Sequence, residues 1–195
     1  MSEKQEYRSA RRSRKLIRDA YISLLKEKDL GKITVADITR RADISRTTFY
    51  AHYADAPAVT QSLEQEILDG ILDIMSQERY GSFCKNPLPL LQKVSAFYAK
   101  DLAFYKALIH VDEFVRFKQN MSDLYVTRMM TDESVPYAVR QSPEFIAMAQ
   151  YTACGIEGTY IAWFQDKIPI TLDEMTETLA RAVQLGTEKI IESSK

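Results

Sequence analysis

The chain has 195 residues, 46% of them hydrophobic, and a formal net charge of −1, so it is long enough to form a sizeable core in one domain or two small ones. It contains no apolar run of about 18 residues and no signal peptide, which excludes a membrane span and predicts a cytoplasmic protein. Its two cysteines, Cys84 and Cys154, show no CxxC or Cys/His spacing, so we expect free thiols rather than a disulfide or a metal site.

Charge is distributed unevenly along the chain. Residues 1–53 contain 13 Lys or Arg against 7 Asp or Glu, a net charge of +6, whereas the remaining residues contain 13 against 20, a net charge of −7. A basic head on an acidic body is typical of a protein that binds a polyanion at one end. A chance fluctuation is the alternative interpretation.

Nearly every segment is predicted to be helical, since glycine and proline are scarce and no strand-like alternation is sustained. A disordered start over residues 1–8 is expected to lead into a first helix over residues 11–28. Basic residues at a helix start oppose the helix dipole, so phosphate attraction explains them better than local stability does, although a merely solvated face is the alternative. These residues are Arg8, Arg11, Arg12, Arg14, Lys15 and Arg18.

Residues 34–53, TVADITRRADISRTTFYAHY, predict a short helix, a tight turn and a second short helix. Thr34 and Asp37 have the spacing of a capping box. Asp43 is expected to end the first helix with a left-handed backbone, and Ser45 to cap the second. The expected motif core is Ile38, Ala42, Ile44, Phe49 and Tyr53, and the expected outward stripe is Arg46, Thr47, Tyr50 and Ala51. Such a small, polar stripe is typical of a helix that enters a DNA groove.

The stretch ITVADITRRADISRTTFYAHYAD resembles the DNA-binding signature of the TetR family (TetR/AcrR) of bacterial transcriptional regulators. The resemblance covers about residues 11–71 and rests on the helix-opening threonine, the Ala-x-Ile-Ser turn, the Thr-Phe-Tyr core and the following His-aromatic pair. It implies an all-α fold of about nine helices. A three-helix helix-turn-helix domain would occupy residues 11–71, and an effector-binding and dimerisation domain residues 72–195.

The resemblance also implies DNA contacts. Arg46 would bind guanine, while Thr47 and Thr48 would contact a thymine methyl group or a base edge. Thr34, Tyr50, His52 and the basic start of the first helix would hold phosphates and fix the register. The complete expected DNA-binding set is Thr34, Ser45, Arg46, Thr47, Thr48, Tyr50, His52, Arg11 and Arg12.

Two residues depart from the family pattern. Asp43 replaces a common glycine, and Ala56 replaces a common phosphate-binding lysine. We therefore expect the basic start of the first helix to supply more of the phosphate contact.

The body is predicted to contain helices over residues 55–79, 88–99, 101–110, 112–130 and 143–166, and a last helix from Thr171. Residues 80–89 and 131–142 are predicted to be loops. Glycines inside a helix are unfavourable unless another backbone packs closely, as between subunits, and the apolar stripe of the last helix suggests the same contact. The expected homodimer interface, for which packing within one chain is the alternative, is Gly155, Gly158, Met175, Leu179 and Val183.

Aromatic residues are frequent between residues 83 and 163, which suggests either an effector pocket or a plain core. Glu157 stands out as a polar residue on an apolar helix, although a simple pair with a basic residue would also explain it. The candidate effector-binding residues are Phe104, Tyr105, Tyr125, Met129, Glu157 and Trp163.

The sequence shows no catalytic constellation: a phosphate-binding glycine loop, GxSxG and HExxH are all absent, and His110 is expected to be structural or exposed. We therefore expect a protein that is not an enzyme and needs no cofactor. The leading hypothesis is a dimeric repressor of a palindromic double-stranded operator, released by a small-molecule effector. The alternative is a DNA-bound adaptor whose body binds a protein partner.

Overall fold

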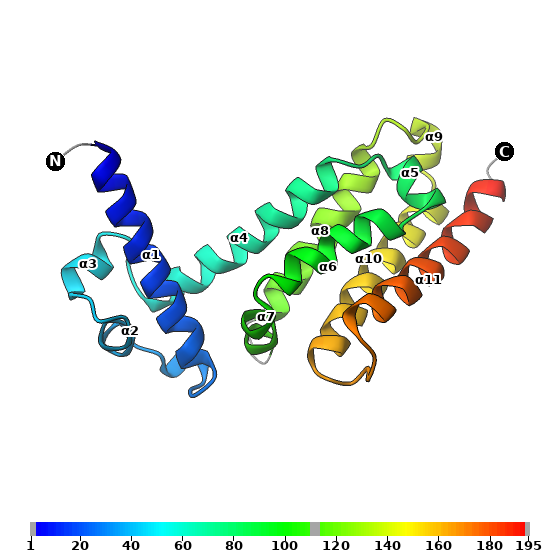
Figure 1. The fold of residues 1–195 in the computed structure, drawn as a ribbon. Helices are drawn as coiled ribbons and strands as arrows, with labels where there is room; N and C mark the ends of the chain where they lie inside the picture. The colour runs from blue at the N-terminus through cyan, green and yellow to red at the C-terminus, as the bar shows by residue number, and fades with distance from the viewer. Residues whose placement is uncertain (1–2, 110–113, 194–195) are drawn as a thin grey trace. The chain divides into compact units, whose positions relative to one another are not determined.

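The computed structural model describes the backbone of residues 3–109 and 114–193, and the side chains of residues 7–29, 31–109 and 120–186. Within these ranges it contains eleven α-helices, one short 3-10 helix and no strand (Figure 1). The prediction of an all-α fold is confirmed, although two short helices were missed. The chain divides into two compact units, Met1–Ile67 and Leu68–Lys195.

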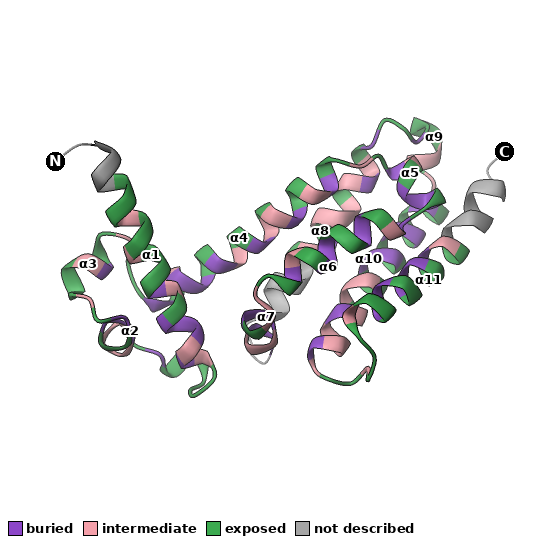
Figure 2. Ribbon diagram, viewed as in Figure 1, coloured by how far each residue is buried: buried purple, intermediate pink, exposed green. Residues whose placement is uncertain are grey.

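The first unit contains α1 (Glu3–Leu25), the 3-10 helix Leu30–Lys32, α2 (Val35–Ala42), α3 (Arg46–Tyr50) and the first part of α4 (Ala56–Ser76). The helix α1 already includes residues 3–8, so the expected disordered start is wrong for this stretch. Figure 2 shows that α1 is largely exposed over residues 7–16 and that burial begins at Ile17. Ile17 and Tyr21 join Ile38, Phe49 and Val59 in the core of the unit.

Two ion pairs fasten α2 to the end of α1 and the residues after it. The guanidinium of Arg41 donates hydrogen bonds of 3.0 and 2.7 Å to the two carboxylate oxygens of Glu27. Lys28 lies 3.0 Å from the carboxylate of Asp37. The bidentate pair of Arg41 and Glu27 fixes geometry as well as adding energy, so it helps to orient α2 relative to the end of α1.

The second unit contains the rest of α4, α5 (Tyr80–Lys85), α6 (Leu88–Ala99), α7 (Leu102–Leu108), α8 (Phe114–Thr131), α9 (Tyr137–Arg140), α10 (Pro143–Phe164) and α11 (Leu172–Ser193). The helix α10 packs against α8 and α11, and α11 also packs against α5 and α6 (Figure 1). The core of the second unit includes a cluster of aromatic rings around Tyr98. The centroid of the Tyr98 ring lies 4.8 Å from that of Tyr105, 5.1 Å from that of Tyr160 and 5.3 Å from that of Phe164.

The predicted loops at residues 80–89 and 131–142 are wrong in part, because they contain α5 and α9. The carboxylate of Asp132 accepts a 2.8 Å hydrogen bond from the backbone N–H of Tyr80, and this bond satisfies one of the free donors at the start of α5. Pro136 stands at the N-cap of α9. The bond between Asp132 and Tyr80, which stabilises the start of α5, joins residues 52 positions apart, so no local sequence pattern reveals it.

Candidate nucleic-acid interface

The start of α2 is held by the predicted capping box. The Thr34 hydroxyl accepts the N–H of Asp37 at 3.2 Å, and the Asp37 carboxylate accepts the N–H and the hydroxyl of Thr34 at 3.1 and 2.8 Å. The hydrogen bond from the Thr34 hydroxyl, with that from Lys28, lowers the pKa of Asp37 to about 2. Thr34 is therefore engaged as a cap beside a permanent negative charge, and its expected phosphate contact remains a prediction.

The turn between α2 and α3 has the predicted left-handed residue. Asp43 has φ 51° and ψ 51°, and its N–H caps α2 by donating to the carbonyl of Thr39. Ile44 follows Asp43 directly, and its side chain is half-buried. Because a left-handed backbone is unfavourable for a residue with a Cβ, the turn carries some strain that a glycine would remove.

The helix α3 is capped and anchored on one face only. Ser45 accepts the N–H of Thr48 at 3.0 Å, and the two hydroxyls lie 2.9 Å apart, so the predicted cap is confirmed. Phe49 is completely buried, with Tyr53 half-buried beside it at a ring distance of 5.9 Å. The opposite face is exposed and consists of Arg46, Thr47, Tyr50 and Ala51. The helix therefore presents an arginine, a threonine and a tyrosine from a rigid base.

Arg14, in the basic start of α1, acts on His52, which lies two residues beyond the end of α3. Arg11, Arg12 and Arg14 are exposed, and the charge of Arg14, together with the larger effect of partial burial, lowers the pKa of His52. His52 is consequently neutral at pH 7 and can donate an N–H to an anion. The structure thus brings a cation of α1 and His52 of the motif close together within one unit.

No protein-family model matches the chain. A curated relative, the uncharacterised HTH-type transcriptional regulator YxbF of Bacillus subtilis, is 40% identical over 72 residues, which make up 36% of this chain and only 19% of that protein. A solved structure from Syntrophomonas wolfei, assigned to the TetR family of transcriptional regulators, has a TM-score of 0.70 over 92% of this chain and 95% of its own, with 15% identity. The fold is that of the TetR family.

A second structure with this fold is the dihydroxyacetone kinase operon activator DhaS, which has a TM-score of 0.62 and 16% identity, and covers 91% of this chain and 97% of its own. The resemblance in the helix-turn-helix sequence and the TetR fold therefore agree. Together with the HTH-type relative they support a transcriptional regulator of the TetR type.

In this TetR-type fold the candidate effector residues that the structure describes lie in different environments. Phe104, Tyr105 and Met129 are buried in the core, and Trp163 donates a 2.8 Å hydrogen bond to the carbonyl of Ile170. Glu157 is half-buried. Tyr125 and Met129 border the same small cavity. The burial of Phe104 and Tyr105 agrees with the interpretation as plain core, and their role in an effector site stays a prediction.

The candidate dimer residues divide into two groups. Met175, Leu179 and Val183 are buried in the single chain, and Leu179 and Val183 also line a groove of about 520 Å³ between α10 and α11. Gly155 and Gly158 are exposed, and an added Cβ at either position would meet nothing within 4 Å in the described structure. Gly155 lines the groove between α10 and α11. Tyr151, a large and highly exposed side chain, lines the groove as well.

Other candidate chemistry is limited. Burial raises the pKa of Cys84 to about 11, whereas Cys154 is exposed. Across the described residues, no group of three His, Cys, Asp or Glu is placed to hold a metal ion. No helix in the described part of the chain combines the length and apolar character needed to cross a membrane. His110 lies outside the described residues.

Proposed function

We propose that this protein is a DNA-binding transcriptional regulator that reads double-stranded DNA with α3. The observation that carries the proposal is the division of α3 into a buried anchor, Phe49, and an exposed face of Arg46, Thr47 and Tyr50. A helix that only packs within its domain has no need of such a face, whereas a recognition helix uses it to approach base edges.

The contacts follow from the chemistry of the exposed groups. Arg46 binds a guanine through two parallel hydrogen bonds, and Thr47 contacts a thymine methyl group or a base edge. Tyr50, His52 and the arginines of α1 hold phosphates and fix the register of α3 in the groove. Thr48 and Ser45 bind each other in the free protein, so they support the helix start and reach DNA only after that bond rearranges.

We further infer a homodimer that binds a palindromic operator. Each chain carries one reading helix, and two such helices reach successive major grooves about 34–36 Å apart. The groove between α10 and α11, which is lined by Tyr151, Gly155 and Val183 among others, supports pairing of two chains there. This groove shares Leu179 and Val183 with the interface expected from the sequence, whereas Met175 is buried and does not line it.

The leading proposal for regulation is repression that a small-molecule effector relieves, by favouring a conformer with lower operator affinity. DhaS, which shares the fold, is named an operon activator, so the fold is compatible with either direction of control. The alternative proposal is an adaptor whose body binds a protein. A ligand that stabilises the protein and releases DNA supports the first proposal, and a protein captured by the body supports the second.

The deciding experiment is footprinting and fluorescence anisotropy with the DNA upstream of the protein's own gene. We expect a palindromic footprint, and a loss of sequence preference in the double variant Arg46→Ala, Tyr50→Phe. Arg181→Ala, which removes an exposed arginine from α11, is the matched control and should bind as the wild type does. Unchanged affinity, salt dependence and sequence preference in the double variant would refute the assignment of α3.

A further inference from the structure

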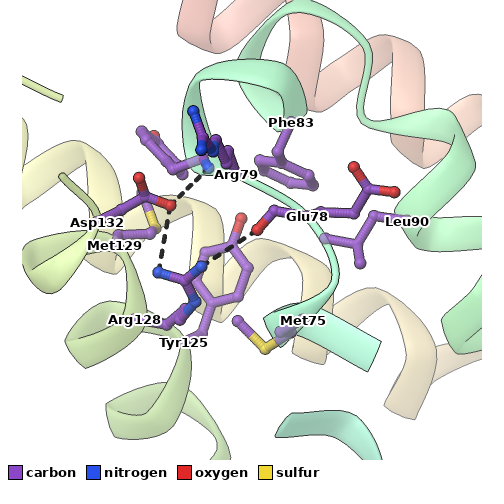
Figure 3. A pocket seen from close by; sticks show the side chains of 10 residues that line it. Met75, Glu78, Arg79, Phe83, Leu90, Tyr125, Arg128, Met129 and Asp132 are labelled. Atoms are coloured by element: carbon purple, nitrogen blue, oxygen red, sulfur yellow. Dashed lines mark hydrogen bonds and ion pairs between the residues drawn. The ribbon is translucent and has the colours of Figure 1, made fainter. Parts of the chain in front are cut away.

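A small cavity lies in the second unit, where the end of α4 meets α5, α6 and α8 (Figure 3). Its volume is about 20 Å³, which is room for about one water molecule. Met75, Phe83, Leu90 and Met129 form its apolar walls, and the polar groups come from Tyr125, Arg128 and Asp132 together with Glu78 and Arg79. The cavity combines apolar and polar lining residues as a ligand site does, but its volume is much smaller than that of a ligand site.

Tyr125 places an unsatisfied hydroxyl in this region. Its Oη is buried and has no hydrogen-bond partner among the residues that the structure describes. The ring packs edge-on against Phe83 at 5.9 Å, and Figure 3 shows the hydroxyl pointing into the space between Phe83, Leu90 and Arg128. Burial raises the pKa of Tyr125, so the hydroxyl stays protonated and is available as a donor. A buried donor without an acceptor is unfavourable and calls for an explanation.

Arg128 and Asp132 form a latch beside this hydroxyl. Arg128 donates to the backbone carbonyl of Glu78 at 3.2 Å and lies 3.2 Å from the carboxylate of Asp132. The same carboxylate accepts the N–H of Tyr80 at 2.8 Å and, with its other oxygen, the N–H of Ser134 at 2.8 Å. The latch thus fastens the link between α4 and α5 to α8.

We propose that this cavity is the closed form of the effector site, and that it takes a small organic anion with an apolar body, such as an aromatic carboxylate. The carboxylate accepts from the Tyr125 hydroxyl and from Arg128, taking the place of the Glu78 carbonyl. Both oxygens of Asp132 are already engaged, so the site offers donors and favours an acceptor over a cation. The flexible side chains of Met75 and Met129 can move aside to make room for the apolar body.

Regulation follows from where the latch is attached. Glu78 and Tyr80 follow the C-terminal end of α4, and α4 is one helix whose first residues belong to the DNA-binding unit. An anion that takes Arg128 away from Glu78 releases the end of this helix. The state in which Arg128 has left Glu78 then gains population over the state in which the two are bonded. The size of the shift is set by how much more tightly the anion binds the first state than the second. The inference rests on the proposed function, of which it specifies the ligand class.

Tyr125→Phe tests the hydroxyl in the full-length protein. The variant loses only the unsatisfied donor, so we expect its melting temperature without ligand to rise above that of the wild type. Tyr137→Phe, which removes an exposed hydroxyl on α9, is the control and should leave the melting temperature unchanged. A lower melting temperature in Tyr125→Phe would mean that the hydroxyl has a partner, such as a bound water, and would overturn the proposal.

Benzoate tests the ligand class, with benzylamine as a cation of similar size and the total salt held constant. We expect millimolar benzoate to raise the melting temperature of the wild type by a few degrees and to weaken operator binding about tenfold. Both effects should vanish in Tyr125→Phe, and benzylamine should produce neither. No benzoate effect in the wild type, or an equal effect in the variant, contradicts the inference while DNA binding stands. A wild type that fails to bind DNA refutes the proposed function. In that case the effect of benzoate on the melting temperatures of the wild type and Tyr125→Phe still tests the anion site.

Discussion

Gly70 of α4 lies directly against the ring of Phe97 of α6. A Cβ added at Gly70 would stand 2.5 Å from Cε2 and 2.6 Å from Cζ of that ring, closer than carbon atoms approach without displacement. The glycine is therefore what allows α4 to pass so near α6 in the second unit.

Gly70→Ala should destabilise the protein. Overpacking against Phe97 outweighs the higher helix propensity of alanine, and we expect a net loss of about 1–2 kcal/mol in the free energy of unfolding. Urea denaturation measures it. Combining Gly70→Ala with Phe97→Leu should recover part of the loss, because leucine leaves room for the methyl group. A stabilised single variant would show that the ring moves aside freely.

Asp43→Gly should stabilise the first unit. Asp43 is exposed and adopts a left-handed backbone, so glycine relieves strain without removing a packed side chain. We expect a gain of about 0.5–1 kcal/mol. Asp43→Val, whose branched side chain tolerates this backbone poorly, should destabilise by about 1–2 kcal/mol. Thermal and urea unfolding of the three proteins provide the comparison, and equal stabilities would exclude strain at this turn.

The capping box at Thr34 and Asp37 predicts a specific pH dependence. The folded-state pKa of Asp37, about 2, lies below its ordinary value of 3.8, so the folded protein holds this proton less tightly than the unfolded chain does. The carboxylate therefore contributes stability that is fully present above about pH 4 and is lost as the pH falls toward about 2.

Asp37→Asn isolates this contribution. We expect the wild type to exceed the variant in stability by a constant amount above about pH 5, and the difference to shrink steadily below about pH 4. Urea titrations at a series of pH values measure the difference. A difference that does not change across this range would assign the stabilisation to something other than the ionised carboxylate.

The helix-turn-helix could be predicted from sequence because its determinants are local. The bonds of Thr34 with Asp37 and of Ser45 with Thr48 each span three positions, and Asp43 acts through its own backbone. Segments fixed by such short-range chemistry reveal themselves in a single sequence. The same reasoning missed α5, whose first N–H is held by Asp132 from far along the chain.

The body could not be predicted in the same detail, because equivalent residue types have different neighbours there. Gly155 and Gly70 both lie inside a helix. Of the two, Gly70 is packed closely against a neighbouring side chain and Gly155 is not. Met175 belongs to an apolar stripe that would suit either a core or a dimer interface, and the fold assigns it to the core. Tyr125 differs from the other aromatic residues only in the environment of its hydroxyl, which no sequence pattern indicates.

The proposed dimer interface makes the last prediction. Tyr151 on α10 and Tyr137 on α9 are similarly exposed, at 78% and 70%, but only Tyr151 borders the groove between α10 and α11. If two chains pair through that face, Tyr151→Ser removes a large apolar contact from it and should weaken dimerisation about tenfold or more.

Sedimentation equilibrium of both variants provides the measurement. Tyr137→Ser should dimerise as the wild type does and bind the operator normally. Tyr151→Ser should show more monomer and, because each chain carries a single reading helix, a correspondingly weaker and less cooperative binding to a palindromic site. Equal dimerisation of the two variants would remove this face from the proposed interface, and a wild type that stays monomeric at micromolar concentration would exclude the dimer itself.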